Sequence, residues 1–563
     1  MAQSAARTQG SDNGTRLKAL AERFRGRGPH LTIVLDGWGC GAHDEGDAIH
    51  QARTPTLERL LATCAHTRIL THGPYVGLPA AKDIGGSEVG HLTLGAGRVV
   101  PQGPTRIKRL IESGQFQAGE TLNRLISHCV GQAGALHLLG LLSDGNVHSH
   151  ISHFEAVIAH AVEKGVPRLY VHALLDGRDV PYQSALDYIE PLEARCEAIC
   201  RAHSGWDYGI ASGGGREAIT MDRDTNWEKV RRGWEVHVHG REGEPFPSAA
   251  AAVREFRRRA PDTFDQDLPP FVVVRDGRPR GPMRDSDSVI CMNFRADRVI
   301  EFSRAMVEDG FTAFDRGARP KVLYAGMMTY DEDTGLPPET LVPAGGVANP
   351  FGRRIVELGL HQFRLAETQK YAHVTFFYNG GYREPLDPTR EQYVLIPSDK
   401  IASFAQAPAM KAREIGEKAR ELILAGRFAY GLINFANTDM VGHTGDLAAA
   451  VRSAEAVDAA LARLLEALAQ AGGTALITAD HGNADEMISP NPKTGRREPN
   501  TRHSLNPVPA ILYDPLYRGP ADYTLRPPDG AEPNTLARVM ATNYLLLGRL
   551  PPDDVDGPLF DLN

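Results

Sequence analysis

The chain has 563 residues, more than one hydrophobic core usually holds, so at least two domains are expected. Hydrophobic residues make up 42% and charged residues 23%, the balance of an ordinary globular protein, and the formal net charge of −8 argues against a general nucleic-acid binder. The chain has no run of about 18 apolar residues, so no membrane span is predicted. Six scattered cysteines without disulfide or zinc spacing favour reduced thiols in a cytoplasmic protein.

Residues 1–29 are rich in arginine and lack the apolar core of a secretory signal. We expect a poorly ordered extension with one short helix near Leu17–Phe24. A transit peptide is the alternative interpretation.

Apolar runs typical of strands alternate with helical patterns, which predicts an α/β fold. The first strand is His30–Leu35, followed by a turn that begins at Asp36. Two later strands, Tyr430–Phe435 and Ala475–Thr478, flank a long amphipathic helix over Asp446–Gln470. Asp or His follows each strand at its carboxyl end, where open α/β sheets bind their ligands.

The middle of the chain, residues 102–344, has strands and helices of its own, among them Arg168–Leu174 and Asp187–Arg201. The polar residues suited to a shared metal site all lie outside this segment. We therefore predict a second domain inserted into a first, discontinuous domain formed by residues 30–101 and 345–563.

Four separated segments offer metal ligands after strands or turns. Aspartate and histidine without cysteine suit Mn²⁺, Zn²⁺, Mg²⁺ or Co²⁺. Each residue alone has a structural alternative, because an Asp at a strand end often caps a helix and a single His is often only hydrogen-bonded. Several such segments in one chain make coincidence a poor explanation. The candidates are Asp36 in LDGWG, Asp439 and His443 in NTDMVGHTG, Asp480 and His481 in TADHGNAD, and His503 in TRHSLNPVP.

A candidate nucleophile lies in GGSEVGHLTLGAG, where Ser87 follows two glycines and precedes a helical pattern. A helix amino terminus favours negative charge on the hydroxyl oxygen and on an arriving phosphoryl group. A divalent metal would supply the activation that a free serine lacks. Ser87 is also a plausible helix cap, and the two roles are compatible. Phosphatase, sulfatase and phosphomutase all remain open on these grounds.

Five arginines of the inserted segment lie in short polar turns beside glycine or aspartate, and guanidinium groups bind carboxylate and phosphate through paired hydrogen bonds. The alternative for any one of them is a surface salt bridge. Asp179 and His148 are candidates for proton transfer. Lys370, just ahead of an expected strand, is a candidate to meet a transferring phosphoryl group, with a surface lysine as the alternative. The arginines are Arg178, Arg216, Arg223, Arg295 and Arg298.

The full set of motifs resembles the cofactor-independent phosphoglycerate mutases of the alkaline phosphatase superfamily, from about His30 to the C-terminal region. The resemblance implies an alkaline-phosphatase-like metal-binding core with an inserted α/β domain that binds substrate. The motifs that carry it are DGWG, GGSEVGH, SDGNVHSH, DGRD, MDRD, NFRADR, QKYAHVTFF, TDMVGHTG, TADHGNAD and HSLNPVP.

By that resemblance, Ser87 takes the phosphoryl group from 3-phosphoglycerate, and the bound glycerate takes it back on its 2-hydroxyl with Asp179 as proton shuttle. Lys370 stabilises the phosphoryl group. One metal ion is held by Asp439, His443 and His503, and the other by Asp36, Ser87, Asp480 and His481. The residues that match the family's substrate contacts are His148, Arg178, Asp179, Arg216, Arg223, Arg295, Arg298 and Lys370.

The resemblance further implies two divalent ions, with Mn²⁺ the first choice and Mg²⁺ or Co²⁺ as alternatives, and no 2,3-bisphosphoglycerate. It implies a cytoplasmic monomer of glycolysis and gluconeogenesis that acts on a small molecule, with no nucleic-acid or membrane partner. The main rival is a metal-dependent phosphatase or sulfatase of the same superfamily, in which water takes the group from Ser87. The arginine-bearing insert argues against it, because a simple hydrolase need not retain the leaving alcohol.

Two positions depart from the family's usual motifs. Where bacterial members commonly read SDGGVHSH and GNSEVGH, this chain has Asn146 and Gly86. Neither change removes an expected ligand, but Gly86 lacks a side chain that could contact the phosphate.

Overall fold

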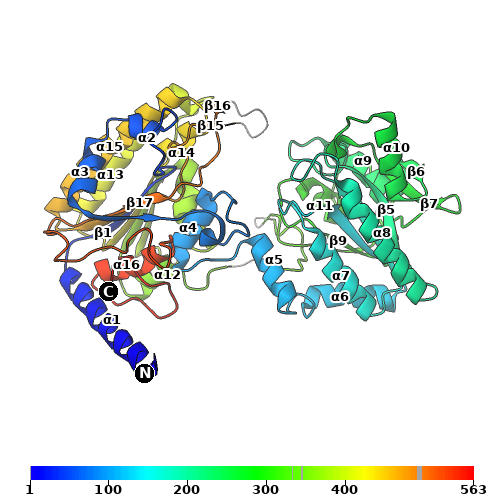
Figure 1. Ribbon diagram of the computed structural model, residues 1–563, viewed down its shortest axis with the longest axis horizontal. Coiled ribbons are helices and arrows are strands. Elements are labelled where there is room, and N and C mark those ends of the chain that lie inside the picture. The colour runs from blue at the N-terminus through cyan, green and yellow to red at the C-terminus, as the bar shows by residue number, and fades with distance from the viewer. Residues whose placement is uncertain (1, 332–333, 344–345, 491–496, 563) are drawn as a thin grey trace. The chain divides into compact units, whose positions relative to one another are not determined.

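The computed structural model describes residues 2–331, 334–343, 346–490 and 497–562. The chain forms two compact units, residues 1–102 with 346–563 and residues 103–345 (Figure 1). Each unit has a sheet and hydrophobic clusters of its own. The domain boundary expected at residues 344 and 345 lies outside the described residues.

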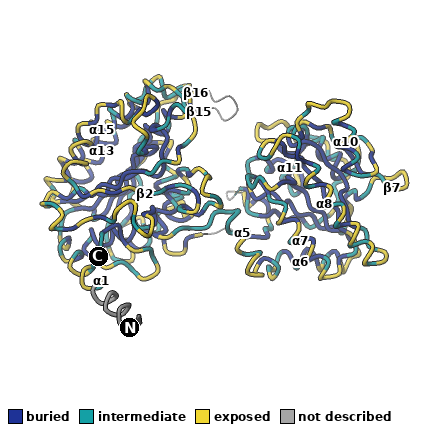
Figure 2. The backbone as a smooth tube through the Cα atoms, in the orientation of Figure 1, coloured by how far each residue is buried: buried dark blue, intermediate teal, exposed yellow. Residues whose placement is uncertain are grey.

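The first unit is built on a seven-stranded sheet in which β17 alone runs antiparallel to its neighbours. The central strands are buried along their whole length, which explains their nearly continuous apolar sequences (Figure 2). In spatial order the strands are β12 (Glu391–Ile396), β11 (Gln362–Glu367), β13 (Tyr430–Phe435), β1 (His30–Leu35), β14 (Thr474–Thr478), β17 (Val508–Tyr513) and β2 (Ala65–Ile69).

Helices cover both faces of this sheet (Figure 1). The predicted long helix is α15, which starts one residue after Asp446 because that side chain caps it by accepting from Ala449 N. One face carries α3 (Pro55–Thr63), α13 (Ala412–Leu424) and α15 (Leu447–Gln470), and the other α4 (Ser87–Ala96), α12 (Phe351–Glu357) and α16 (Arg538–Leu546). Shorter elements are α2 (Ala48–Gln51), α14 (Asn437–Gly442), β15 (Ile488–Pro490) and β16 (Arg497–Pro499).

The amino-terminal segment differs from its prediction. Helix α1 spans Ala2–Phe24, three times the length expected, and its last two turns pack on the first unit. Phe24 is buried against Tyr523 and Phe560, and Arg27 pairs with Asp514 at 2.6 Å. Apolar residues at helical spacing thus anchor what was expected to be a poorly ordered extension.

The second unit has an eight-stranded sheet in which β6 and β7 run antiparallel to the other main strands. The predicted strand Arg168–Leu174 corresponds to β4, and the predicted helix Asp187–Arg201 to α8. The strands in spatial order are β10 (Leu323–Gly326), β9 (Ser288–Cys291), β3 (Leu136–Leu141), β4 (Arg168–Leu175), β5 (Asp207–Gly215), β7 (Phe271–Arg275) and β6 (Glu244–Phe246), with β8 (Arg278–Pro279) paired to β7.

Helices again lie on both faces, so both units confirm the predicted α/β class. One face packs against α5 (Gly103–Glu112), α6 (Glu120–Gly131), α7 (Ile151–Glu163), α8 (Ala185–Ala202) and α10 (Ala249–Arg259), and the other against α9 (Trp227–His237) and α11 (Ile300–Val307). Across the described residues, we find no helix with the length and apolarity needed to cross a membrane.

Candidate metal centre and nucleophile

Three buried aspartates meet at the carboxyl edge of the first sheet. Asp36 follows β1, Asp439 lies in α14 just after β13, and Asp480 follows β14. These three strands are adjacent and parallel, so their carboxyl ends share one edge. Segments far apart in the chain therefore supply carboxylates to one place.

Ser87 is the first residue of α4 and is almost completely buried. Its hydroxyl donates to Asp36 Oδ1 at 3.2 Å and lies 2.8 Å from His481 Nε2. Lys370 Nζ donates to Ser87 Oγ at 2.5 Å. The hydroxyl thus lies at a helix amino terminus with a carboxylate, an imidazole and an ammonium group around it.

Lys370 lies in a short 3₁₀ turn, Thr368–Lys370, that follows β11. Its ammonium group donates to Asp36 Oδ1 and Asp439 Oδ2, both at 2.7 Å. The strand expected after it is wrong, because His373–Phe377 is a π-helical turn packed against α4. Short apolar runs do not distinguish a strand from a buried helical turn.

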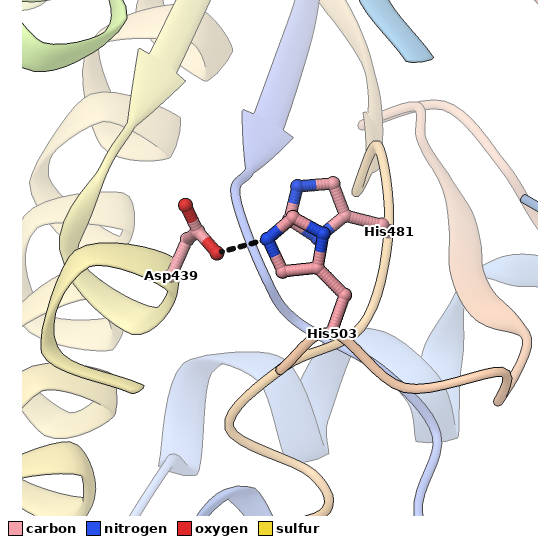
Figure 3. Close-up of side chains that lie close together, drawn as sticks. All are labelled: Asp439, His481 and His503. Carbon is pink, nitrogen blue, oxygen red and sulfur yellow. Dashed lines mark ion pairs between the residues drawn. The ribbon is translucent and has the colours of Figure 1, made fainter. Parts of the chain in front are cut away.

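Three histidines complete this centre. Nε2 of His443 and Nε2 of His503 each lie 3.2 Å from Asp439 Oδ1 and 3.0 Å from each other. The His481 ring stacks on His503 at 3.7 Å, and Figure 3 shows both rings facing Asp439. The ring nitrogens of all three lie close to carboxylate oxygens.

Charge in the centre is unbalanced. Burial, together with the nearby Asp480 carboxylate, raises the pKa of Asp36 to about 7. Burial would also raise the pKa of Asp439, but the Lys370 charge and hydrogen bonds from His443 and His503 hold it well below its ordinary value. Burial would lower the pKa of Lys370, yet the carboxylates raise it. Three carboxylates face one ammonium group, which leaves an excess of buried negative charge.

The donor set fits divalent cations. Ligand atoms of Asp439, His481 and His503 lie within 4.8 Å of one another, as do those of Asp36, Asp480 and His481. The buried Oδ2 of Asp480 accepts no hydrogen bond from any described residue. The nearby His91 Nδ1 is 3.3 Å from it and lies 2.9 Å from the Ser87 carbonyl oxygen. Carboxylate and imidazole ligand atoms, the Asp480 oxygen that lacks a hydrogen-bond donor, and the excess of negative charge together fit a metal site.

Three supporting residues were missed in the sequence. Asn434 Nδ2 donates to Asp36 Oδ2 at 2.7 Å and to His91 Nε2 at 3.1 Å, and Asn483 Nδ2 donates to Asp439 Oδ1 at 2.8 Å. His91 had a signal, because it lies four residues after Ser87 and so on the same helical face. Such contacts orient ligating carboxylates.

The second unit has a polar cluster at the carboxyl edge of its own sheet. Arg216, which follows β5 and is buried, donates to Asp176 Oδ1 at 3.0 Å and to Asp179 Oδ2 at 2.5 Å. Ser143 donates to Asp176 Oδ2 at 2.6 Å. The DGRD motif and Arg216 are thus brought into direct contact.

Glu217, which the sequence analysis also missed, forms ion pairs with three cationic side chains. Its carboxylate pairs with Arg298 at 3.0 Å, Lys229 at 3.1 Å and Arg178 at 3.3 Å. Arg295 pairs with Asp297 at 3.1 Å.

His148 lies beside these arginines. Its Nδ1 is 3.6 Å from Asp297 Oδ1. Burial, then the charges of Arg216, Arg295, Arg298 and Arg178, lower the pKa of His148 to about 3. Six of the seven candidates in this unit are therefore in electrostatic contact, while Arg223 is exposed and pairs with no other described residue.

The two departures from the usual motifs are both accommodated. Asn146 adopts φ +56°, a left-handed conformation that asparagine tolerates better than most residues. Gly86 has an extended φ of −156°, and a Cβ there would meet only His503, at 3.6 Å. Position 86 therefore does not require glycine.

Comparison with known proteins gives a consistent match over nearly the whole chain. A family model described as the Metalloenzyme superfamily matches residues 28–549. The chain is 44% identical over 548 residues to the 2,3-bisphosphoglycerate-independent phosphoglycerate mutase of Trypanosoma brucei brucei, covering 94% of this chain and 97% of that protein. It is 41% identical over 540 residues to the protein of that name from Ricinus communis, covering 94% and 96%. A crystal structure of Leishmania mexicana phosphoglycerate mutase at low cobalt concentration matches with a TM-score of 0.66 and 40% identity, covering 96% of this chain and 98% of that one.

Proposed function

This chain belongs to the 2,3-bisphosphoglycerate-independent phosphoglycerate mutases, within the Metalloenzyme superfamily, and we propose that it interconverts 3-phosphoglycerate and 2-phosphoglycerate through a phosphoserine at Ser87. The proposal includes two divalent ions, Mn²⁺ before Mg²⁺ or Co²⁺, and no added bisphosphoglycerate. It also includes a monomer acting in the cytoplasm, in glycolysis and gluconeogenesis.

The observation that carries the proposal is the environment of the Ser87 hydroxyl. Asp36, His481 and Lys370 all lie within 3.2 Å of Ser87 Oγ, at the amino terminus of α4. A structural serine at a helix end needs no buried ammonium group and no carboxylate beside it. A nucleophile that carries a phosphoryl group does need compensating positive charge.

The metal ions would be held by the aspartates and histidines of the first unit. Asp439, His443 and His503 would hold one ion, and Asp36, Ser87, Asp480 and His481 the other, with His481 close enough to contribute to either. When bound, such ions lower the pKa of a serine hydroxyl and neutralise phosphoryl oxygens.

Ser87 and Lys370 have distinct roles in the two halves of the reaction. Ser87 Oγ forms a bond to phosphorus as the bond between phosphorus and the 3-oxygen of the substrate breaks, and Lys370 supplies positive charge to the phosphoryl oxygens. The proton lost by Ser87 is balanced by the proton that the 3-oxygen gains. In the second half, the 2-oxygen loses its proton, attacks phosphorus and releases Ser87 Oγ, which is protonated again.

Glycerate must stay bound between these two halves. Arg178, Arg216, Arg295 and Arg298 would hold its carboxylate and hydroxyl groups, together with His148 and the exposed Arg223. Asp179 already accepts from Arg216 at 2.5 Å, and it would pass the proton between the 2- and 3-oxygens. Retention of glycerate is what separates a mutase from a hydrolase.

A direct test supplies 3-phosphoglycerate and Mn²⁺ without bisphosphoglycerate and follows 2-phosphoglycerate and free phosphate together. We expect 2-phosphoglycerate to form with little phosphate release, and a chelator to stop the reaction. Ser87→Ala should abolish turnover. Ser453→Ala, which removes a buried hydroxyl that donates to the carbonyl of Ala450 in α15, should leave it unchanged.

Three outcomes would count against the proposal. Release of phosphate without 2-phosphoglycerate would indicate the hydrolase. Isomerisation by Ser87→Ala would remove the serine route. Undiminished turnover after chelation would remove the metal requirement.

A further inference from the structure

A strained turn separates two of the arginines proposed to bind substrate. Thr220 has φ +66°, and Met221 N donates across it to Ile219 O at 2.7 Å. This is a γ-turn with a positive φ at its central residue, which is the rare and strained form of that turn. A β-branched residue in that region is an outlier that persists only where its surroundings hold it. The turn lies between Arg216 and Arg223.

Helix α9 holds this turn in three ways. His237 Nε2 lies 3.0 Å from Thr220 Oγ1, and Thr220 N donates to Lys229 O at 3.2 Å. A Cβ on Gly233 would lie 2.2 Å from Thr220 Oγ1 and 3.0 Å from Thr220 N. The turn is fully buried and pressed directly against the helix backbone.

His237 is itself part of a buried chain of hydrogen bonds that ends at Thr220. Ser212 Oγ lies 2.8 Å from His237 Nδ1 and 2.7 Å from His172 Nδ1. His172 Nε2 lies 3.0 Å from His137 Nδ1, whose Nε2 is 3.1 Å from Asp287 Oδ2. The chain begins at the amino end of β9, crosses β3, β4 and β5, and reaches Thr220 beyond the carboxyl end of β5.

Burial and hydrogen bonding define the charge states of three members of the chain. Burial lowers the pKa of His172 well below its ordinary value and that of His237 to about 3, so both rings are neutral. Asp287, held ionised despite burial by the hydrogen bond from His137, can only accept. A neutral ring donates from one nitrogen and accepts on the other, so His172 and His237 each connect two hydrogen bonds of the chain. The Thr220 hydroxyl, 3.0 Å from His237 Nε2, is the far end of that chain.

We propose that Thr220 is a positioning residue for substrate binding, whose hydroxyl, as the last member of the hydrogen-bonded chain from Asp287, fixes the turn that places Arg216 and Arg223. The same turn contacts a third arginine, because Arg298 Nη1 lies 3.5 Å from Met221 O. This inference rests on the proposed function of these arginines. The hydroxyl touches no reacting atom and acts through the backbone.

The test compares Thr220→Val, which keeps the β-branch but loses the hydroxyl, with Thr220→Ser, which keeps the hydroxyl. Thr220→Gly loses the hydroxyl but relieves the strain, so a folding defect cannot explain a shared effect of Val and Gly. We expect Val and Gly to raise KM for 3-phosphoglycerate about tenfold with a smaller change in kcat, and Ser to stay within about twofold of wild type. Gly233→Ala, which displaces the turn without altering Thr220, should act like Val.

Thr225→Val is the matched control. Thr225 also has a positive φ, +58°, but it is exposed and its hydroxyl donates only to the Asp224 carbonyl oxygen. This variant should retain the wild-type KM. A Thr220→Val or Thr220→Gly enzyme with wild-type KM would overturn the inference and leave the proposed mutase activity intact.

Calorimetric binding of 3-phosphoglycerate to the full chain carrying Ser87→Ala separates the two hypotheses. If wild-type protein shows no mutase activity, the proposed function fails, and the affinity series alone decides the role of Thr220. Weaker binding with Val and Gly but not with Ser supports positioning. Equal binding by all three overturns it.

Discussion

Among the residues that the structure describes, Lys370 is the single ammonium group beside three buried carboxylates, in hydrogen-bond contact with two of them and with Ser87. Lys370→Met would leave those carboxylates without their ammonium partner. Breaking a buried ion pair by removing one partner costs about 3–5 kcal/mol. We expect the metal-free variant to lose stability on this scale, and added Mn²⁺ to recover part of the loss, because divalent charge compensates the same carboxylates.

Urea unfolding with and without Mn²⁺ measures the effect. Lys411→Met is the control, since Lys411 pairs with the half-exposed Asp399 and should cost at most about 1 kcal/mol. Equal stability of Lys370→Met and wild type without metal would show that the carboxylates do not depend on this lysine.

Gly86 gives a prediction with the opposite sign. Its extended backbone suits any residue, and a Cβ would make only ordinary contact with His503. Gly86→Asn should therefore fold as well as wild type, lose some unfolded-chain entropy, and keep or raise kcat/KM by placing an amide beside the phosphoryl group. A thermal melt and a kinetic assay check both parts. A fall in kcat/KM of more than about tenfold would show that glycine is required there.

For single residues, the sequence predicted the site where a residue type is uncommon at its position in the fold. Aspartates at strand ends and the serine after two glycines pointed to a centre that the sheet then assembles. Glu217, Asn434 and Asn483 were missed, because amides and carboxylates that act through hydrogen bonds have no distinctive spacing. The contacts of Lys370 with two aspartates were also beyond sequence, since they join β11 to segments far away in the chain.

Helix α1 makes a prediction at the scale of an element. Phe24 is buried between Tyr523 and Phe560, so the helix is packed into the first unit by its end. Phe24→Ala should cost about 3–5 kcal/mol, the usual range for truncating a buried aromatic side chain. Glu22→Ala, at an exposed position two residues before Phe24, should change the free energy of unfolding by no more than about 0.5 kcal/mol. Urea unfolding of both variants distinguishes an anchored helix from an accessory one, for which the two would be equal.

Elements with long periodic patterns were the most predictable. The helix over Asp446–Gln470 and the strand His30–Leu35 agree with α15 and β1 to within a residue. The extent of α1 and the π-helical turn at His373–Phe377 were not predicted. In both, tertiary packing decides the conformation of a segment whose local pattern is ambiguous.

The whole molecule has a pH dependence set by buried neutral histidines. Burial lowers the pKa of His30 to about 4 and of His237 and His373 to about 3. Their unfolded value is near 6.5, so below that pH the unfolded chain binds protons that the folded protein excludes. The stability lost through these three histidines should be zero above about pH 6.5 and grow as the pH drops toward about 4, by about 1.4 kcal/mol per pH unit for each of them.

His443 and His503, whose pKa is raised beside Asp439, titrate in the opposite sense: in the metal-free protein their contribution to stability is present below about pH 6.5 and is lost above it, so it leaves the slope at lower pH unchanged. Urea unfolding at several pH values gives the net slope. His30→Gln should flatten it, whereas His66→Gln, at an exposed position of β2, should not. A slope that is the same in both variants would contradict the role of buried histidine.

The strand order of the first sheet also bears on how the protein is made. On the described residues, β1 pairs only with β13 and β14, and β2 pairs with β17, so the segment before the insert has no strand partner of its own. Tyr430 and Thr32, bonded across β13 and β1, are 398 residues apart. A ribosome would therefore expose β1 and β2 long before their neighbours exist, while residues 103–345 emerge with a complete sheet. The inserted unit can fold during synthesis, and Asp36 and Ser87 must wait for the C-terminal third of the chain before they meet their partners.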